Sequence, residues 1–210
     1  MISTTEKGDS FRDTVANLLD SAGFRAVSEV RRQFKKVDIE AIWNDRLDGP
    51  TLLLIEAKNY EKNLDKEDCM KFIIEYETLL ESKKDRRAWL VSKSDISPDG
   101  RALIDARHGL KCFTYHEMQR WIFDLTDYTH ELIGEFDQER IETYFIPPKT
   151  SDGEDLDGLV DKWLHSEVGQ PLAITGSYGI GKTTFAKHLS ARLGKKSISD
   201  VTARVPILIP

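Results

Sequence analysis

Three ionisable residues, Asp38, Glu56 and Lys58, have the types and the spacing that phosphodiester hydrolysis requires. Asp38 lies in an alternating segment, and the other two lie in an apolar segment further along the chain. The polar stretch 44–50 predicts a turn between the two segments, so they should pair as a hairpin. In a hairpin centred on residue 47, Asp38 opposes Glu56, and Lys58 shares their face. We therefore expect three ionisable groups to meet on this hairpin.

Two carboxylates at close range repel each other, and one pKa rises unless a cation lies between them. Mg²⁺ is the natural cation, because it prefers oxygen ligands and keeps several of its waters. Asp38 and Glu56 are the predicted metal ligands, and the Ala57 carbonyl is a candidate third ligand. Lys58 would position or activate the water that attacks a phosphodiester. The simpler alternative is an edge hairpin on which Glu56 and Lys58 form a solvent-facing ion pair.

A second pattern with chemical meaning is Gly-Ser-Tyr-Gly-Ile-Gly-Lys-Thr, which occupies residues 176–183. Its three glycines let backbone N–H groups converge on phosphates, and the helix that follows points its positive end at them. The lysine can reach the β- and γ-phosphates of ATP, and the threonine Thr183 can ligate the Mg²⁺ of ATP. The predicted ATP-binding residues are Gly176, Gly179, Gly181, Lys182, Thr183 and Thr184.

The predicted ATP-binding module is short of the elements that hydrolysis requires. An acid at the end of a later strand must orient water, yet the residues after the loop leave room for one further strand. Periodicity predicts strands at 171–175 and 205–209 and helices at 156–165 and 182–193. We therefore expect residues 154–210 to be the N-terminal part of a P-loop NTPase domain that is incomplete in this chain.

The elements around Asp38 and Glu56 alternate between helices and strands. Ser10 and Asp13 have capping-box spacing, so the first helix should begin at Ser10. Periodicity predicts strands at 25–34, 37–43, 51–58, 88–92 and 110–115 and helices at 66–82, 98–108 and 116–125. This order indicates an α/β fold with a mixed sheet flanked by helices. The stretch 126–153 contains turn-forming residues and is predicted to be a linker between domains.

Composition narrows the class of protein without identifying a function. Of the 210 residues, 40% are hydrophobic and 31% are charged, which is ordinary for a soluble globular protein. No apolar run is long enough for a membrane span, and two cysteines, Cys69 and Cys112, favour a reducing cytoplasm. A net charge of −6 argues against a generally basic surface, so DNA contacts would come from local patches. The basic segments 31–36 and 83–87 are candidates, and a solvated face is an equal alternative for both.

Residues 8–125 resemble the Mrr-like restriction endonuclease domains of the PD-(D/E)xK nuclease superfamily. The resemblance rests on the first helix from Phe11 to Phe24 and on the segments Val37–Ile39, Ile55–Tyr60 and Ala88–Ser92. It implies a restriction-endonuclease-like domain over residues 1–125. It also implies that Asp38, Glu56 and Lys58 bind Mg²⁺ and cleave DNA, with double-stranded DNA as the expected substrate.

The resemblance raises one further candidate residue, in the first helix. An acidic residue there, often next to a phenylalanine, frequently assists catalysis in this superfamily. Here Arg12 follows Phe11, so Asp13 is the residue that could take this part. The capping box gives Asp13 a second explanation, and the sequence leaves both open.

Residues 144–185, together with 205–210, look like the start of a NACHT-type STAND NTPase. A nuclease followed by such a module is the arrangement of bacterial antiviral defence proteins. The resemblance implies a homo-oligomer that assembles with ATP and activates the nuclease when a sensor detects a phage-derived trigger. No sensor region is present in this chain.

The leading hypothesis is a Mg²⁺-dependent DNA endonuclease effector controlled by an ATP-binding STAND-type module in anti-phage defence. The alternative is a catalytically inactive, nuclease-like module that binds DNA or a partner protein on an ATP-driven assembly. The intact set of Asp38, Glu56 and Lys58 favours the enzyme, because a binding module needs none of the three. A third hypothesis is a P-loop ATPase that the front domain merely caps.

Overall fold

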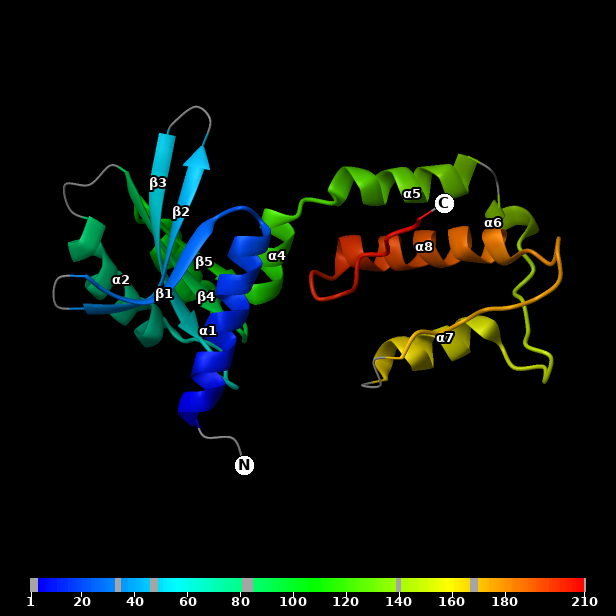
Figure 1. Ribbon diagram of the computed structural model, residues 1–210, viewed down its shortest axis with the longest axis horizontal. Coiled ribbons are helices and arrows are strands. Elements are labelled where there is room, and N and C mark those ends of the chain that lie inside the picture. The colour runs from blue at the N-terminus through cyan, green and yellow to red at the C-terminus, as the bar shows by residue number, and fades with distance from the viewer. Residues whose placement is uncertain are drawn as a thin grey trace. The chain divides into compact units, whose positions relative to one another are not determined.

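The computed structural model divides the chain into two compact units, Met1–Phe123 and Asp124–Pro210 (Figure 1). Within the residues that the structure describes, side chains are described except at positions 4–8, 45 and 142. The predicted turn at 44–50 and the basic segment 83–87 lie partly outside the described residues. No helix in the described part of the chain is both long and apolar enough to cross a membrane. The structure describes residues 4–32, 35–45, 49–80, 85–138, 141–166 and 170–209.

The first unit contains a five-stranded sheet in the order β1-β2-β3-β4-β5. Strands β1, β2 and β3 are antiparallel neighbours, whereas β3, β4 and β5 run parallel. The mixed sheet predicted from the sequence is therefore confirmed. The strands are β1 (Arg25–Arg32), β2 (Lys35–Asp45), β3 (Gly49–Lys58), β4 (Arg86–Ser92) and β5 (Leu110–Thr114).

Helices cover both faces of this sheet (Figure 1). One core layer joins the sheet to α1 (Thr4–Ser21) and α4 (Tyr115–Ile122) through side chains such as Val15 and Met118. The opposite layer joins it to α2 (Lys66–Leu80) and α3 (Pro98–Asp105). Because both faces are buried, the middle of β3 is apolar on both sides, and residues 53–55 are all fully buried.

Helix α1 begins at Thr4, so the prediction that it begins at Ser10 is wrong. Because the helix begins before Ser10, the backbone N–H groups that follow Ser10 already donate within the helix and need no capping side chain. The Thr14 hydroxyl donates instead to the Ser10 carbonyl at 2.8 Å, one turn apart inside the helix. Asp13 is consequently not a capping-box acid.

The second unit contains four helices among its described residues: α5 (Thr126–Gln138), α6 (Ile141–Tyr144), α7 (Leu156–His165) and α8 (Lys182–Ser199). Figure 1 shows α5 lying along α8. A Cβ atom on Gly194 of α8 would lie 3.2 Å from a Thr129 methyl, so glycine permits this close approach. The prediction of a linker over 126–153 is wrong at α5, because Leu132 and Phe136 form a buried helical face.

Two strands predicted for the second unit, at 171–175 and 205–209, are not formed. A strand exists through the hydrogen bonds of a ladder, and neither segment has a partner strand among the described residues of this unit. The strand predictions for these two apolar runs are therefore wrong. The predicted helix at 182–193 is present and continues to Ser199.

Candidate active site

The hairpin of β2 and β3 has the predicted register, which pairs Ile39 with Ile55. The ladder does not continue to Asp38. The Asp38 carboxylate instead accepts a hydrogen bond from the backbone N–H of Ala57 at 2.9 Å. This hydrogen bond takes the place of the next backbone hydrogen bond between the two strands, so the pairing of β2 with β3 ends at Asp38. The hairpin thus opens beside Glu56, the neighbour of Ala57.

An irregularity in β1 and β2 accompanies this opening. Glu29, opposite Asp38, has a φ of +59°, in the left-handed region that residues with a Cβ rarely adopt, while the pairs on either side remain in register. Val37 belongs to the core layer of α2, whereas Ile39, two residues later, belongs to the layer of α1. The strand therefore changes face at Asp38. Lys35, before the change, reaches the α2 side, where Glu56 also lies.

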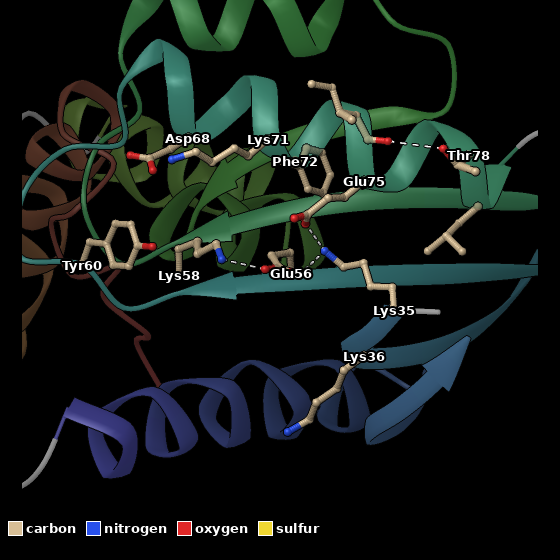
Figure 2. A pocket seen from close by; sticks show the side chains of 12 residues that line it. Lys35, Lys36, Glu56, Lys58, Tyr60, Asp68, Lys71, Phe72, Glu75 and Thr78 are labelled. Atoms are coloured by element: carbon tan, nitrogen blue, oxygen red, sulfur yellow. Dashed lines mark hydrogen bonds and ion pairs between the residues drawn. The ribbon is translucent and has the colours of Figure 1, made fainter. Parts of the chain in front are cut away.

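Glu56 is buried and contacts three donor side chains, of which Figure 2 draws Lys58 and Lys35. Its Oε1 accepts from Lys58 Nζ at 2.6 Å, its Oε2 accepts from the Tyr76 hydroxyl at 2.7 Å, and Lys35 Nζ lies 3.3 Å from Oε2. Burial alone raises the pKa of Glu56, but Lys58, Tyr76 and Lys35 outweigh it and hold the pKa below its ordinary value. Glu56 is therefore a carboxylate at neutral pH.

Asp38 has the opposite electrostatic balance. Burial and then repulsion by Glu56 raise its pKa, and the Ala57 N–H, Lys58 and Arg12 offset only part of this rise. The cations that act on Asp38 therefore do not fully offset its burial and its repulsion by Glu56. Lys58 loses some basicity through burial, but its pKa is raised on balance, chiefly because Glu56 stabilises the ammonium. Lys58 is therefore a cation in this structure and not a ready base.

A cavity of about 640 Å³ lies beside Glu56, between the ends of β2 and β3 and helix α2 (Figure 2). Figure 2 shows Lys58 and Lys35 approaching Glu56 from opposite sides. The residues that line the cavity include Lys35, Lys36, Glu56, Lys58, Tyr60 and Lys71. The arrangement provides carboxylates and ammonium groups at an open surface, which suits a phosphate-containing substrate.

The donor set fits a divalent cation that also takes water and substrate oxygens. Asp38 and Glu56 are two hard oxygen donors, close enough that Glu56 raises the Asp38 pKa, and a cation between them would relieve that repulsion. Mg²⁺ is commonly held by one or two carboxylates plus phosphates and waters. Among the described residues, no cluster of three or more His, Cys, Asp or Glu side chains could hold a metal. The protein would thus supply only part of the coordination.

Helix α1 turns Arg12 toward this region, and Asp13 away into solvent. The Arg12 guanidinium lies 2.5 Å from Glu29 and ranks among the charges that act on Asp38. Asp13 is exposed, and its recorded partner is Arg12. The accessory catalytic role of Asp13 stays a prediction, because Asp13 pairs with Arg12. The residue next to Phe11 is thus the cation Arg12 and not an acid.

Lys35 and Tyr76 are the site residues that the sequence did not single out. Lys35 belongs to the basic segment 31–36, which was recognised only as a patch. Tyr76 lies on the apolar face predicted for the helix at 66–82, where its hydroxyl was indistinguishable from a core feature. Two other charges of segment 31–36 form ion pairs, Arg32 with Glu40 and Lys36 with Glu29. Together with Lys35, three cations of this segment therefore have carboxylate partners within the chain.

The phosphate-loop residues lie in the second unit, at the start of α8. Gly179 and Gly181 adopt φ values of +79° and +95°, which only glycine tolerates readily. Lys182 Nζ donates to the carbonyls of Gly176 and Ser177 at 2.8 and 2.9 Å and so folds over the loop. Thr183 and Thr184 follow in the first turn of α8. The loop therefore leads directly into the N-terminus of α8, and residues 171–175 before it form no strand.

Replacing Asp38 by asparagine should raise the melting temperature of the metal-free protein at neutral pH. A pKa raised by folding means that the fold prefers the neutral carboxyl, so stability is lost as the pH rises through the folded-state pKa. Asparagine can keep the bond from Ala57 without the charge. Thermal unfolding in EDTA should show the gain at pH 7 and a shrinking gain on acidification. A lower melting temperature at pH 7 would mean that the Asp38 charge stabilises the fold.

Residues 4–122, more than half of the chain, match the Mrr-type catalytic family, which is described as a restriction endonuclease. An uncharacterized WD repeat-containing protein of Nostoc sp. strain PCC 7120 is 30% identical over 128 residues. The match covers 50% of this chain, and the chain spans 8% of the length of that relative.

Solved structures resemble the first unit more distantly. A protein of unknown function, AF1548, has a TM-score of 0.43 and 16% identity over 52% of this chain and 58% of that one. EndoMS in complex with double-stranded DNA has a TM-score of 0.40 and 15% identity over 51% of this chain and 44% of that one. Because both scores lie below 0.5, the assignment of a family rests on the sequence match alone.

Proposed function

We propose that this chain, which belongs to the restriction endonuclease family, is a Mg²⁺-dependent DNA endonuclease with Asp38, Glu56 and Lys58 as its site. One observation carries the proposal. The backbone pairing of β2 with β3 ends at Asp38, beside Glu56 and the cavity that Glu56 lines, and burial together with repulsion by Glu56 raises the Asp38 pKa. Two carboxylates beside each other do not stabilise a purely structural hairpin, whereas a cation site requires carboxylates that converge in this way.

Each residue has a distinct part in the proposed reaction. Asp38 and Glu56 would hold the cation, which when bound supplies positive charge to the phosphate oxygens during attack. Lys58, charged in this structure, would orient the attacking water and donate a hydrogen bond to the phosphate. Tyr76 fixes the Glu56 carboxylate by its buried hydroxyl, so that one rotamer is maintained while the other partners exchange.

The proposal is tested by incubating the chain with supercoiled plasmid and Mg²⁺. Nicked and linear products should appear, and they should be lost in EDTA and in the Asp38→Asn variant. If duplex DNA is bound but never cleaved under any divalent cation, the alternative of a catalytically inactive binding module is correct. Equal cleavage by the variant would remove Asp38 from the mechanism.

A second candidate function, ATP binding, is favoured by the loop at residues 176–183. Gly179 and Gly181 in this loop have positive φ values. The Lys182 ammonium donates to the carbonyls of Gly176 and Ser177, and a triphosphate could attract it away from them. Thr183 would then ligate the Mg²⁺ of ATP, with Thr184 beside it in the first turn of α8. The absence of a strand on either side within the described residues makes this site less complete than the first.

Lys182→Ala should weaken ATP binding about tenfold to a hundredfold, the value of a hydrogen bond between charged groups. Isothermal titration of ATP–Mg²⁺ measures the effect. Lys195→Ala is a matched control, because Lys195 lies on the same helix but pairs with Asp137 at 3.5 Å. Identical affinities in the two variants would exclude Lys182 from the site.

A regulatory proposal follows from the sequence resemblance of the second unit. The resemblance to STAND NTPases leads us to expect that ATP controls the nuclease within a homo-oligomer, in response to a phage-derived trigger. Cleavage of both DNA strands also requires two sites, which favours assembly. Mass measurement with and without ATP, alongside plasmid cleavage, tests whether assembly and nuclease activity change together.

A further inference from the structure

Lys35 has three partners on the far side of the carboxylate site. Its Nζ lies 3.3 Å from Glu56 Oε2 and forms an ion pair with the Glu75 carboxylate (Figure 2). It also lies 4.3 Å from the centre of the Tyr76 ring. The side chain is mostly buried, with 19% of its surface exposed. Lys35 therefore has a defined position against Glu56, unlike a lysine that extends into solvent.

This position brings Lys35 into competition with a cation. Glu56 already accepts a hydrogen bond from Lys58 at Oε1 and one from Tyr76 at Oε2. The Lys35 ammonium therefore contacts lone pairs of Glu56 that a bound cation would need. An ammonium and a divalent cation also repel each other at such a distance. Filling the site thus requires Lys35 to weaken its contact with Glu56.

The Lys35 ammonium could also move into the cavity, away from Glu56. Its stem is a flexible four-carbon chain, and it borders an open cavity of about 640 Å³ that Lys58 and Lys71 also line. A DNA phosphate in that cavity would provide an anion to replace Glu56, since lysine binds phosphate as a compact point charge.

We propose that Lys35 couples metal binding to DNA binding at this site. Its ammonium occupies Glu56 while DNA is absent and transfers to a backbone phosphate when a strand enters the cavity, which frees Glu56 for the cation. The inference rests on the proposed endonuclease function. By linkage, whatever DNA does to cation affinity, the cation does equally to DNA affinity. Lys35 is a positioning residue in this account.

The test measures Mn²⁺ binding by electron paramagnetic resonance without DNA, and duplex binding in EDTA without metal. Lys35→Met should bind Mn²⁺ about fivefold more tightly than the unaltered chain, the value of a partly exposed ion pair. The same variant should bind a short duplex more weakly. Lys71→Met is the control, because Lys71 lines the cavity without a recorded contact to Glu56, and it should leave Mn²⁺ affinity unchanged.

Lys35→Arg keeps the positive charge and should retain the weaker Mn²⁺ binding of the unaltered chain, which separates competition from a folding defect. Equal Mn²⁺ affinity in Lys35→Met and the unaltered chain would overturn this inference and leave the endonuclease proposal standing. Failure of every variant to bind Mn²⁺ would contradict both. Tighter Mn²⁺ binding with unchanged duplex affinity would also overturn the coupling, because Lys35 would then have no phosphate partner.

Discussion

Replacing Lys58 by methionine should lower the rate of DNA cleavage by about two to four orders of magnitude, the range for a positioned acid–base or charged group. Lys58 is an ammonium in this structure, held by Glu56 at 2.6 Å, and it borders the cavity where a phosphate would lie. Methionine keeps the length of the side chain and removes the charge. Single-turnover cleavage of a short duplex at saturating Mg²⁺ measures the effect.

Cation binding distinguishes this loss from general damage to the site. Lys58 competes with the cation for Glu56, so Lys58→Met should bind Mn²⁺ at least as tightly as the unaltered chain. Lys71→Met serves as the matched control, since it removes an exposed ammonium from the same cavity. Cleavage that falls equally in both variants would show that the lysines contribute only general attraction for DNA.

Replacing Glu56 by glutamine should abolish cation binding and also destabilise the protein, by about 1–3 kcal/mol. A neutral amide deprives Lys58, Lys35 and Tyr76 of a charged acceptor in a mostly buried position. The pKa of Glu56 is lowered by folding, so its stabilisation is present above the unfolded-state value of 4.5 and lost as the pH falls through the folded-state pKa. Urea unfolding in EDTA gives the free energy difference.

Asp38→Asn is the natural comparison for Glu56→Gln, because both exchange a carboxylate for its amide in one site. The first should stabilise the metal-free protein and the second should destabilise it, since folding raises one pKa and lowers the other. Urea midpoints at pH 7 and pH 5 should show this opposition. Two variants that shift the midpoint in the same direction would contradict the electrostatic account of the site.

The sequence was sufficient for the parts of the site that depend on local pattern. Alternation within two segments and a polar turn between them predict the hairpin, and its register, Ile39 with Ile55, follows from their symmetry about residue 47. The order of apolar segments likewise predicts the layered sheet. Such features are readable because each follows from a period of two or 3.6 residues.

The irregularity at Glu29 and Asp38 could not be predicted in this way. A glutamate in the left-handed region has no sequence signature, because the conformation is imposed by the surrounding sheet and by Arg12 and Lys36, which hold its carboxylate. The change of face at Asp38 nevertheless decides which side chains meet Glu56. Strict alternation would place Lys35 on the face opposite Asp38, which is why its contact with Glu56 was missed.

In the second unit, turn-forming residues were a poor guide to where a linker begins. The predicted linker over 126–153 includes the residues of α5 (Thr126–Gln138) and α6 (Ile141–Tyr144). Leu132 and Phe136 at helical spacing, with Asp124 accepting from the Thr126 N–H, were signals for α5 that the prediction overlooked. Strand predictions failed for a different reason, because partners for a ladder are a property of the whole fold.

Anomalous diffraction from crystals soaked in Mn²⁺ would show whether Asp38 and Glu56 together form a divalent-cation site. We expect one peak about 2.1 Å from a carboxylate oxygen of each residue, with Lys35 displaced from Glu56. A map with no peak at this position, or with Mn²⁺ bound to neither carboxylate, would exclude this site.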